Sequence, residues 1–297
     1  MAGFAAEFSS WRWAMRIVLI MGGAALIFLS FLLPETSHGT LLLQRARRLR
    51  KLTGNEKLRS QSELDQAAIE PRQLIKDTIL KPFRLAMEPA LLFLNILLGF
   101  TYAIFYWHFE STAIVFGKYG FSLGESSLPF IAVLLGALLV LPPYFAYIRF
   151  VAQARFKRTG KIIPEERLEV ALFAIGLMPI SLLIYGWSAN RTHWIVPMIG
   201  LLLFVPSLFL LFQSILSYQP LSYPTAVASI MAANTLFRSV IASVFPLFGV
   251  DYFEKVGVDV GSTIIAAITV FCIIPLFFLK RYGHILRAKS HYATDIQ

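Results

Sequence analysis

Residues 194–216 read WIVPMIGLLLFVPSLFLLFQSIL, an apolar stretch that contains no charged side chain. A helix rises 1.5 Å per residue, so roughly 20 such residues cross a hydrocarbon core about 30 Å thick. Backbone N–H and C=O groups find no water inside a bilayer, and a helix satisfies them internally. The stretch therefore predicts a membrane-spanning helix.

Six further segments have the same character, and none alternates as a barrel strand does. The seven predicted spans are 13–33, 89–115, 128–148, 170–187, 194–216, 226–250 and 261–279. The fold class that they predict is all-α, a polytopic membrane helix bundle. The predicted organisation is a first span with its flank (1–33), a basic loop (34–88), a bundle of six helices (89–279) and a tail (280–297).

Composition supports a bilayer as the solvent of this chain. Of 297 residues, 57% are hydrophobic and 15% are charged, whereas soluble domains are about 45–50% apolar and about 25% charged. The net charge of +10 falls in loops between apolar runs, which indicates topology and disfavours nucleic-acid binding. Cys272 is the single cysteine, and the five histidines are scattered. An intramolecular disulfide is thus excluded, and neither a metal nor another cofactor is predicted.

The loops between the spans alternate in their content of lysine and arginine. Twenty-one basic residues lie in loop 34–88, loop 149–169 and the tail, against three in the opposite loops. Because cytoplasmic loops carry an excess of basic residues, we expect the N-terminus outside and the C-terminus inside. Residues 39–84 are hydrophilic, and their basic run at 44–51 suits a solvated connector with an amphipathic stretch on anionic lipid.

Several motifs, taken in order, carry a resemblance to a known family. They are Trp11-Arg-Trp13, Leu33-Pro-Glu-Thr-Ser37, the basic run at 45–51, Pro164-Glu-Glu-Arg-Leu168, Tyr223-Pro-Thr-Ala-Val-Ala-Ser229, Ala233-Asn-Thr-Leu-Phe-Arg-Ser239 and Arg287-Ala-Lys-Ser290. This set resembles fungal drug:proton antiporters of the major facilitator superfamily, from their sixth helix onward. The resemblance covers nearly the whole chain, and the ordered set is more specific than any single motif.

The resemblance implies a multidrug or secondary-metabolite exporter of the plasma membrane, with a small organic substrate and coupling to protons. It also implies that the five helices preceding the first span are absent, together with the family's glycine-rich cytoplasmic loop and its fifth-helix signature. A complete facilitator has two six-helix halves with the substrate at their interface. We therefore expect either a transporter or a transport-incompetent fragment, which would need a missing N-terminal half or a homo-oligomeric partner.

Ionisable residues inside membrane spans are costly and serve as functional hypotheses. Arg238 lies near the middle of the sixth span, with Asn234 one turn earlier on the same face, and Glu110 lies in the second span. We expect Arg238 to face the bundle and to pair with Glu110 or a hydrated cavity. Structural pairing and snorkelling are alternatives for Arg238, and an interfacial position is the alternative for Glu110. The family carries Phe-Glu at the place of Phe109-Glu110, which favours a functional role.

The second span also presents aromatic residues at helical spacing. Tyr102, Tyr106 and Phe109 share one face beside Glu110. This face suits a flat apolar substrate or a cation, although aromatic residues in membranes also simply face lipid. On the fifth span, which the resemblance places at the cavity, Gln213 and Ser217 share a face. Hydrogen bonding between helices is their alternative role.

The sequence therefore predicts a major facilitator transporter without chemistry of its own. A seven-span receptor also fits the number of spans and the outside N-terminus. The long basic loop after the first span, the lack of a cysteine pair and the motif set above all disfavour that alternative.

Overall fold

The computed structural model describes residues 2–55, 57–68, 80–122, 124–160 and 163–288. Within these residues all regular structure is helical. The chain divides after Lys81 into two compact units. The end of the predicted tail, 289–297, lies outside the described residues, as do residues 69–79 of the basic loop.

The N-terminal unit contains α1 (Ala2–Phe8), α2 (Trp11–Leu32), α3 (His38–Thr53) and α4 (Gln61–Ala68). Helix α2 is one of seven helices of the described chain that are long and apolar enough to cross a membrane. It ends directly before Leu33-Pro34, since the residue before a proline avoids the helical conformation. Helix α3 ends at Gly54, whose φ of 65° is left-handed and suits a glycine without a Cβ atom.

A capping box and an ion pair join α3 to α4. The Ser60 N–H donates to the Glu63 carboxylate (2.9 Å), and the Glu63 N–H donates back to the Ser60 hydroxyl (3.3 Å). The Arg50 guanidinium donates to both oxygens of the same carboxylate. The hydrogen bond from Arg50 is the main cause that lowers the pKa of Glu63. The basic loop is therefore partly ordered by its own side chains.

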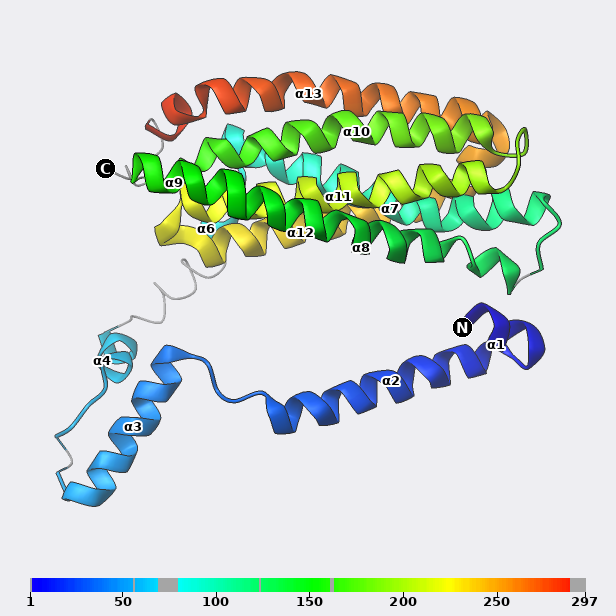
Figure 1. Ribbon diagram of the computed structural model, residues 1–297. Helices are drawn as coiled ribbons and strands as arrows, with labels where there is room; N and C mark the ends of the chain where they lie inside the picture. The colour runs from blue at the N-terminus through cyan, green and yellow to red at the C-terminus, as the bar shows by residue number, and fades with distance from the viewer. Residues whose placement is uncertain (1, 56, 69–79, 123, 161–162, 289–297) are drawn as a thin grey trace. The chain divides into compact units, whose positions relative to one another are not determined.

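The second unit is a bundle of long helices that run side by side (Figure 1). A short helix, α6 (Lys81–Ala86), leads into it, and a π-helical turn, η3, joins α8 to α9. The long helices are α7 (Pro89–Lys118), α8 (Phe130–Ala146), α10 (Arg167–Ser188), α11 (Ile195–Ser222), α12 (Val227–Val256) and α13 (Val258–Ala288). Helix α8 continues through η3 (Tyr147–Ala152) into α9 (Gln153–Thr159).

Helix α10 packs between α11 and α13, α11 packs against α8, and α7 packs against α12. Small residues bring these helices close together, as is usual in membrane bundles. A Cβ atom added at Gly200 would lie 2.8 Å from the Tyr185 backbone nitrogen, and one added at Gly186 would overlap the Ser262 side chain. The α7–α12 contact also contains a stacked pair, Trp107 and Phe253, with ring centroids 4.1 Å apart.

Ion pairs connect the helix ends. Glu169 accepts from Arg155 (2.7 Å) and Lys280 (3.3 Å), which ties α9, α10 and α13 together. Glu165 accepts from Arg287 (2.6 Å) at the same end, and Arg191 pairs with Asp259 at the other. These pairs hold the outer helices around α10 in a fixed arrangement.

All seven predicted spans are confirmed as helices, but four extend well beyond their predicted C-terminal ends. The third continues through η3 to Thr159, the fifth passes Pro220 to Ser222, the sixth runs to Val256, and the last runs to Ala288. Hydropathy marks only the apolar part of a helix, whereas backbone hydrogen bonding continues into the polar interface.

Candidate substrate-binding site

One face of α7 is aromatic and open. Tyr102, Tyr106 and Phe109 follow each other at helical spacing, and Tyr106 and Phe109 are 39% and 41% exposed. The Tyr102 and Tyr106 rings meet edge to face at 5.0 Å, with their hydroxyl oxygens 3.4 Å apart. Phe109 stacks on Phe130 of α8 at 5.0 Å. The predicted aromatic face is therefore present, and it is not covered by the rest of the bundle.

Arg238 of α12 reaches over this face. Its guanidinium carbon lies 5.1 Å from the Tyr102 ring centroid and 5.7 Å from that of Phe212 on α11. Within the described part of the chain, Arg238 makes no ion pair or hydrogen bond, and its Nε is buried without a partner. Such cation–π contacts contribute about 0.5–2 kcal/mol each. The charge is therefore held by ring faces, and its donors remain available.

A hollow of about 270 Å³ lies beside the guanidinium. Its lining combines the two tyrosines and the arginine with small and hydroxyl side chains of α12: Tyr102, Tyr106, Arg238, Ser239, Ala242, Ser243 and Pro246. Ser239 and Ser243 are one turn apart and share a face. The site thus offers a cation, several hydroxyls and flat ring surfaces within one hollow.

The expected pair between Arg238 and Glu110 does not form. Glu110 lies against Gly249 and Trp107, and its Oε2 is buried without a hydrogen-bond partner among the described residues. Helices α7 and α12 run in parallel, and Gly249 is eleven residues beyond Arg238 on α12. At 1.5 Å per residue the backbone position that Glu110 contacts lies roughly 16 Å along α12 from that of Arg238.

Asn234 has a role that sequence analysis missed. Its Nδ2 donates to Asn95 Oδ1 of α7 (3.2 Å) and to Gln219 Oε1 of α11 (3.4 Å), and Gln219 Nε2 donates to Asn95 Oδ1 (3.2 Å). All three amides are buried. Gln219 was missed because it follows the predicted end of the fifth span. Asn95 could have been found from the sequence, because it is a lone amide in an apolar run. This amide cluster joins three helices one turn before Arg238.

Gln213 and Ser217 do not line the hollow. The Ser217 hydroxyl donates to the Gln213 carbonyl of its own helix (2.6 Å). The Gln213 side chain makes no hydrogen bond to a described residue. Helix α11 therefore contributes Gln219 to the amide cluster, and it contributes the ring of Phe212 to the site around Arg238.

These features define an integral, multi-pass α-helical membrane protein with an aromatic and cationic face. The chain is 38% identical to an MFS-type transporter of Aspergillus violaceofuscus in an alignment of 297 residues. The alignment covers 99% of this chain and 54% of that protein. It is 38% identical to a multidrug transporter of Candida glabrata (96% of this chain, 49% of that protein). It is 33% identical to fluconazole resistance protein 1 of Saccharomyces cerevisiae (96% of this chain, 53% of that protein).

The chain is therefore similar over almost its whole length to fungal major facilitator proteins that are named as drug or metabolite transporters, as the resemblance in its sequence predicted. It spans about half the length of the curated relatives it matches, and it corresponds to their C-terminal half. No family model matches the chain. No solved structure matches it either.

Proposed function

We propose that the bundle forms one wall of an export path for small organic molecules, and that the hollow beside Arg238 is its binding site. The observation that carries this proposal is an exposed aromatic face beside an arginine that pairs with no carboxylate of the described chain. An uncompensated cation in a membrane span costs roughly 2.5–3.5 kcal/mol, and such residues usually mark substrate or ion pathways. The transporter names of the relatives support the same function.

The lining of the hollow indicates the substrate class. Flat apolar rings suit the faces of Tyr102 and Tyr106, and the guanidinium donors suit a carbonyl or carboxylate oxygen. The hydroxyls of Ser239 and Ser243 donate or accept further hydrogen bonds. We expect planar, amphipathic molecules with at least one acceptor group.

The open face also needs a second wall. Facilitators transport by rocking one six-helix bundle against the other around a central site. A second bundle, from an N-terminal half or from another copy of the chain, would cover the aromatic face of α7. Proton coupling is part of this proposal, and Glu110 is the candidate carrier in this half, since its residue is half-buried in a span and its carboxylate pairs with no cation among the described residues.

We place the basic loops in the cytosol, with the N-terminus outside and the plasma membrane as the location. The loop charges support this orientation, because twenty-one basic residues lie on one side and three on the other. A cytosol-specific reporter fused after Gln297, or inserted at 55–65, should give a signal at both positions. The absence of a signal at either position would contradict the proposed orientation.

Binding of a dye tests the site directly. Carboxytetramethylrhodamine combines a flat ring system with carboxylates, and its binding to the chain in nanodiscs is measured by fluorescence anisotropy. Arg238→Ala removes charge-assisted hydrogen bonds of about 1.5–3 kcal/mol, so we expect the affinity to fall at least about 10-fold. Arg12→Ala, in the N-terminal unit, should bind as the unchanged chain does. Equal affinity of the Arg238→Ala variant would reject the site.

A further inference from the structure

A second, unassigned groove lies between α8 and α10, with α11 as its floor. It encloses about 520 Å³, and its walls are almost entirely apolar. The residues that define it include Leu139, Pro143, Tyr144, Phe173, Leu177 and Leu210. Leu139 and Phe173 are 59% and 66% exposed, so the groove opens outward from the bundle. It is therefore shaped for a long apolar ligand that enters from the membrane.

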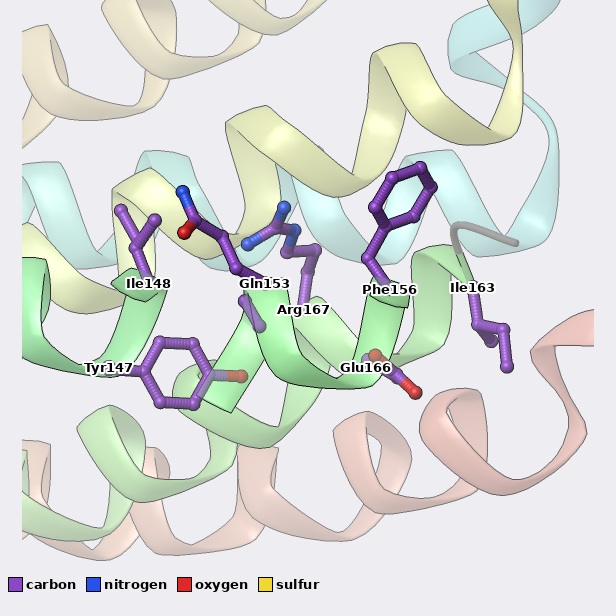
Figure 2. A pocket seen from close by; sticks show the side chains of 8 residues that line it. Tyr147, Ile148, Gln153, Phe156, Ile163, Glu166 and Arg167 are labelled. Atoms are coloured by element: carbon purple, nitrogen blue, oxygen red, sulfur yellow. The ribbon is translucent and has the colours of Figure 1, made fainter. Parts of the chain in front are cut away.

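A smaller hollow of about 180 Å³, more polar than the groove and called the polar hollow below, follows it toward the helix ends; Figure 2 shows the residues that line this hollow. Tyr147 lines both spaces. From there the polar hollow follows α9 to Gln153 and Phe156, and it follows α10 back to Arg167. The two spaces therefore follow each other along the same pair of helices. Tyr147 begins the π-helical turn η3, a distortion often found at functional sites.

Arg167 is the unpaired cation of the polar hollow. The neighbouring acids are already used, since Glu165 pairs with Arg287, and Glu169 pairs with Arg155 and Lys280. Arg167 itself makes no ion pair or hydrogen bond to any residue that the structure describes. Glu166 lines the same hollow, but in Figure 2 its carboxylate and the Arg167 guanidinium point in opposite directions. The hollow thus presents free donors at the end of an apolar groove.

We propose that this composite site binds an anionic phospholipid, with an acyl chain in the apolar groove and the phosphate at Arg167 and Gln153. Three observations favour this ligand: apolar walls that open outward, an arginine at one end that pairs with no described residue, and a surplus of basic residues in 149–169. In the orientation proposed above, on which this step rests, this end lies at the cytoplasmic leaflet, where anionic lipids are concentrated and where basic pockets between helices bind their head groups.

The lipid site is distinct from the proposed substrate site. Leu210 faces the lipid groove, whereas Phe212 contacts Tyr102 and Arg238. Residues i and i+2 of a helix are about 200° apart around its axis. The two sites therefore lie on opposite sides of α11 and share no lining residue. Lipid binding consequently does not depend on the transport proposal.

Thermal unfolding of the 297-residue chain in neutral detergent tests the lipid site. We expect palmitoyl-oleoyl phosphatidylserine to raise the unfolding temperature, and the matching phosphatidylcholine to have little effect. Arg167→Gln should abolish the serine-lipid shift, whereas Lys157→Gln, which removes an exposed charge of α9 outside the hollow, should retain it. Each variant is compared with its own lipid-free sample.

A second variant separates the acyl chain from the head group. Leu177→Trp fills the apolar groove and leaves Arg167 in place, so it should also abolish the shift. Water-soluble glycerophosphoserine should fail to stabilise the unchanged chain. A full shift with glycerophosphoserine, or retention of the lipid shift in both Arg167→Gln and Leu177→Trp, would overturn the proposal. Equal loss in Lys157→Gln and Arg167→Gln would show diffuse charge attraction and would overturn it as well.

Discussion

At the scale of single residues, Arg238 shows how the bundle accommodates a charge within a membrane span. The pair with Glu110 would have cancelled both charges, yet the two residues belong to different levels of the α7–α12 contact. Arg238 instead lies over Tyr102 and Phe212. The sequence predicts the type of residue and the aromatic face, because both follow from helical spacing. It does not predict the pairing, which depends on how far one helix is shifted along another.

A double-mutant cycle distinguishes these two arrangements. The free-energy changes of Arg238→Ala and Glu110→Gln should add within about 0.5 kcal/mol, because distant sites act independently. Arg238→Ala and Tyr102→Leu should instead show a coupling of about 0.5–1 kcal/mol, the size of one cation–π contact. Unfolding of the detergent-solubilised chain by sodium dodecyl sulfate measures both cycles. Strong coupling to Glu110 would contradict the observed register.

The buried amide cluster leads to a second prediction at this scale. Asn95→Leu removes the oxygen that accepts from both Gln219 and Asn234, and it leaves their donors without this partner. We expect a loss of about 1–2 kcal/mol in the free energy of unfolding. Ser217→Ala provides the control, since its hydroxyl bonds only to its own helix. If both variants lost the same stability, the cluster would have no special role in joining the three helices.

At the scale of helices, hydropathy and length suffice to predict the seven spans, because each apolar run is long enough to cross a bilayer. Helix ends are less predictable. Gln219 and Pro220 look like loop residues by composition, yet α11 continues to Ser222. The π-helical turn η3 has no signature in the apolar pattern of 128–148 either. Both features depend on packing against neighbouring helices, which a single sequence does not record.

The contact between α7 and α12 provides a test at this scale. A Cβ atom at Gly249 would overlap the Glu110 carboxylate, whereas one at Gly176 of α10 meets nothing within 4 Å. Gly249→Ala should therefore destabilise the chain by about 1–3 kcal/mol. Gly176→Ala should be neutral or stabilising by up to about 1 kcal/mol, because alanine favours helices.

A combined variant checks the cause of this effect. Glu110→Ala introduced together with Gly249→Ala removes the side chain that the new methyl group meets, so most of the lost stability should return. Denaturant unfolding of Gly249→Ala, of Glu110→Ala and of the combined variant measures this recovery. If the double variant remained as unstable as Gly249→Ala alone, the backbone and not Glu110 would limit the approach of the two helices.

At the scale of the whole molecule, the bundle packs most closely around α7 and α10 and is most open along α12. The buried share of the span is 61% for α7 and 50% for α10 but only 22% for α12. Exposed apolar residues are expected against lipid, but the hydroxyl stripe of Ser239 and Ser243 and the charge of Arg238 are not. Transport as proposed above therefore requires a second bundle against this face before substrate moves across the membrane.

Transport in liposomes with an imposed pH gradient tests this requirement most directly. Accumulation of carboxytetramethylrhodamine is measured for the 297-residue chain alone, and for the chain fused behind the unmatched N-terminal part of the Aspergillus violaceofuscus relative. A third preparation carries Arg238→Ala in the fusion. The account predicts accumulation by the fusion only, and its loss with Arg238→Ala. Gradient-driven accumulation by the 297-residue chain alone, or full activity of the Arg238→Ala fusion, would contradict it.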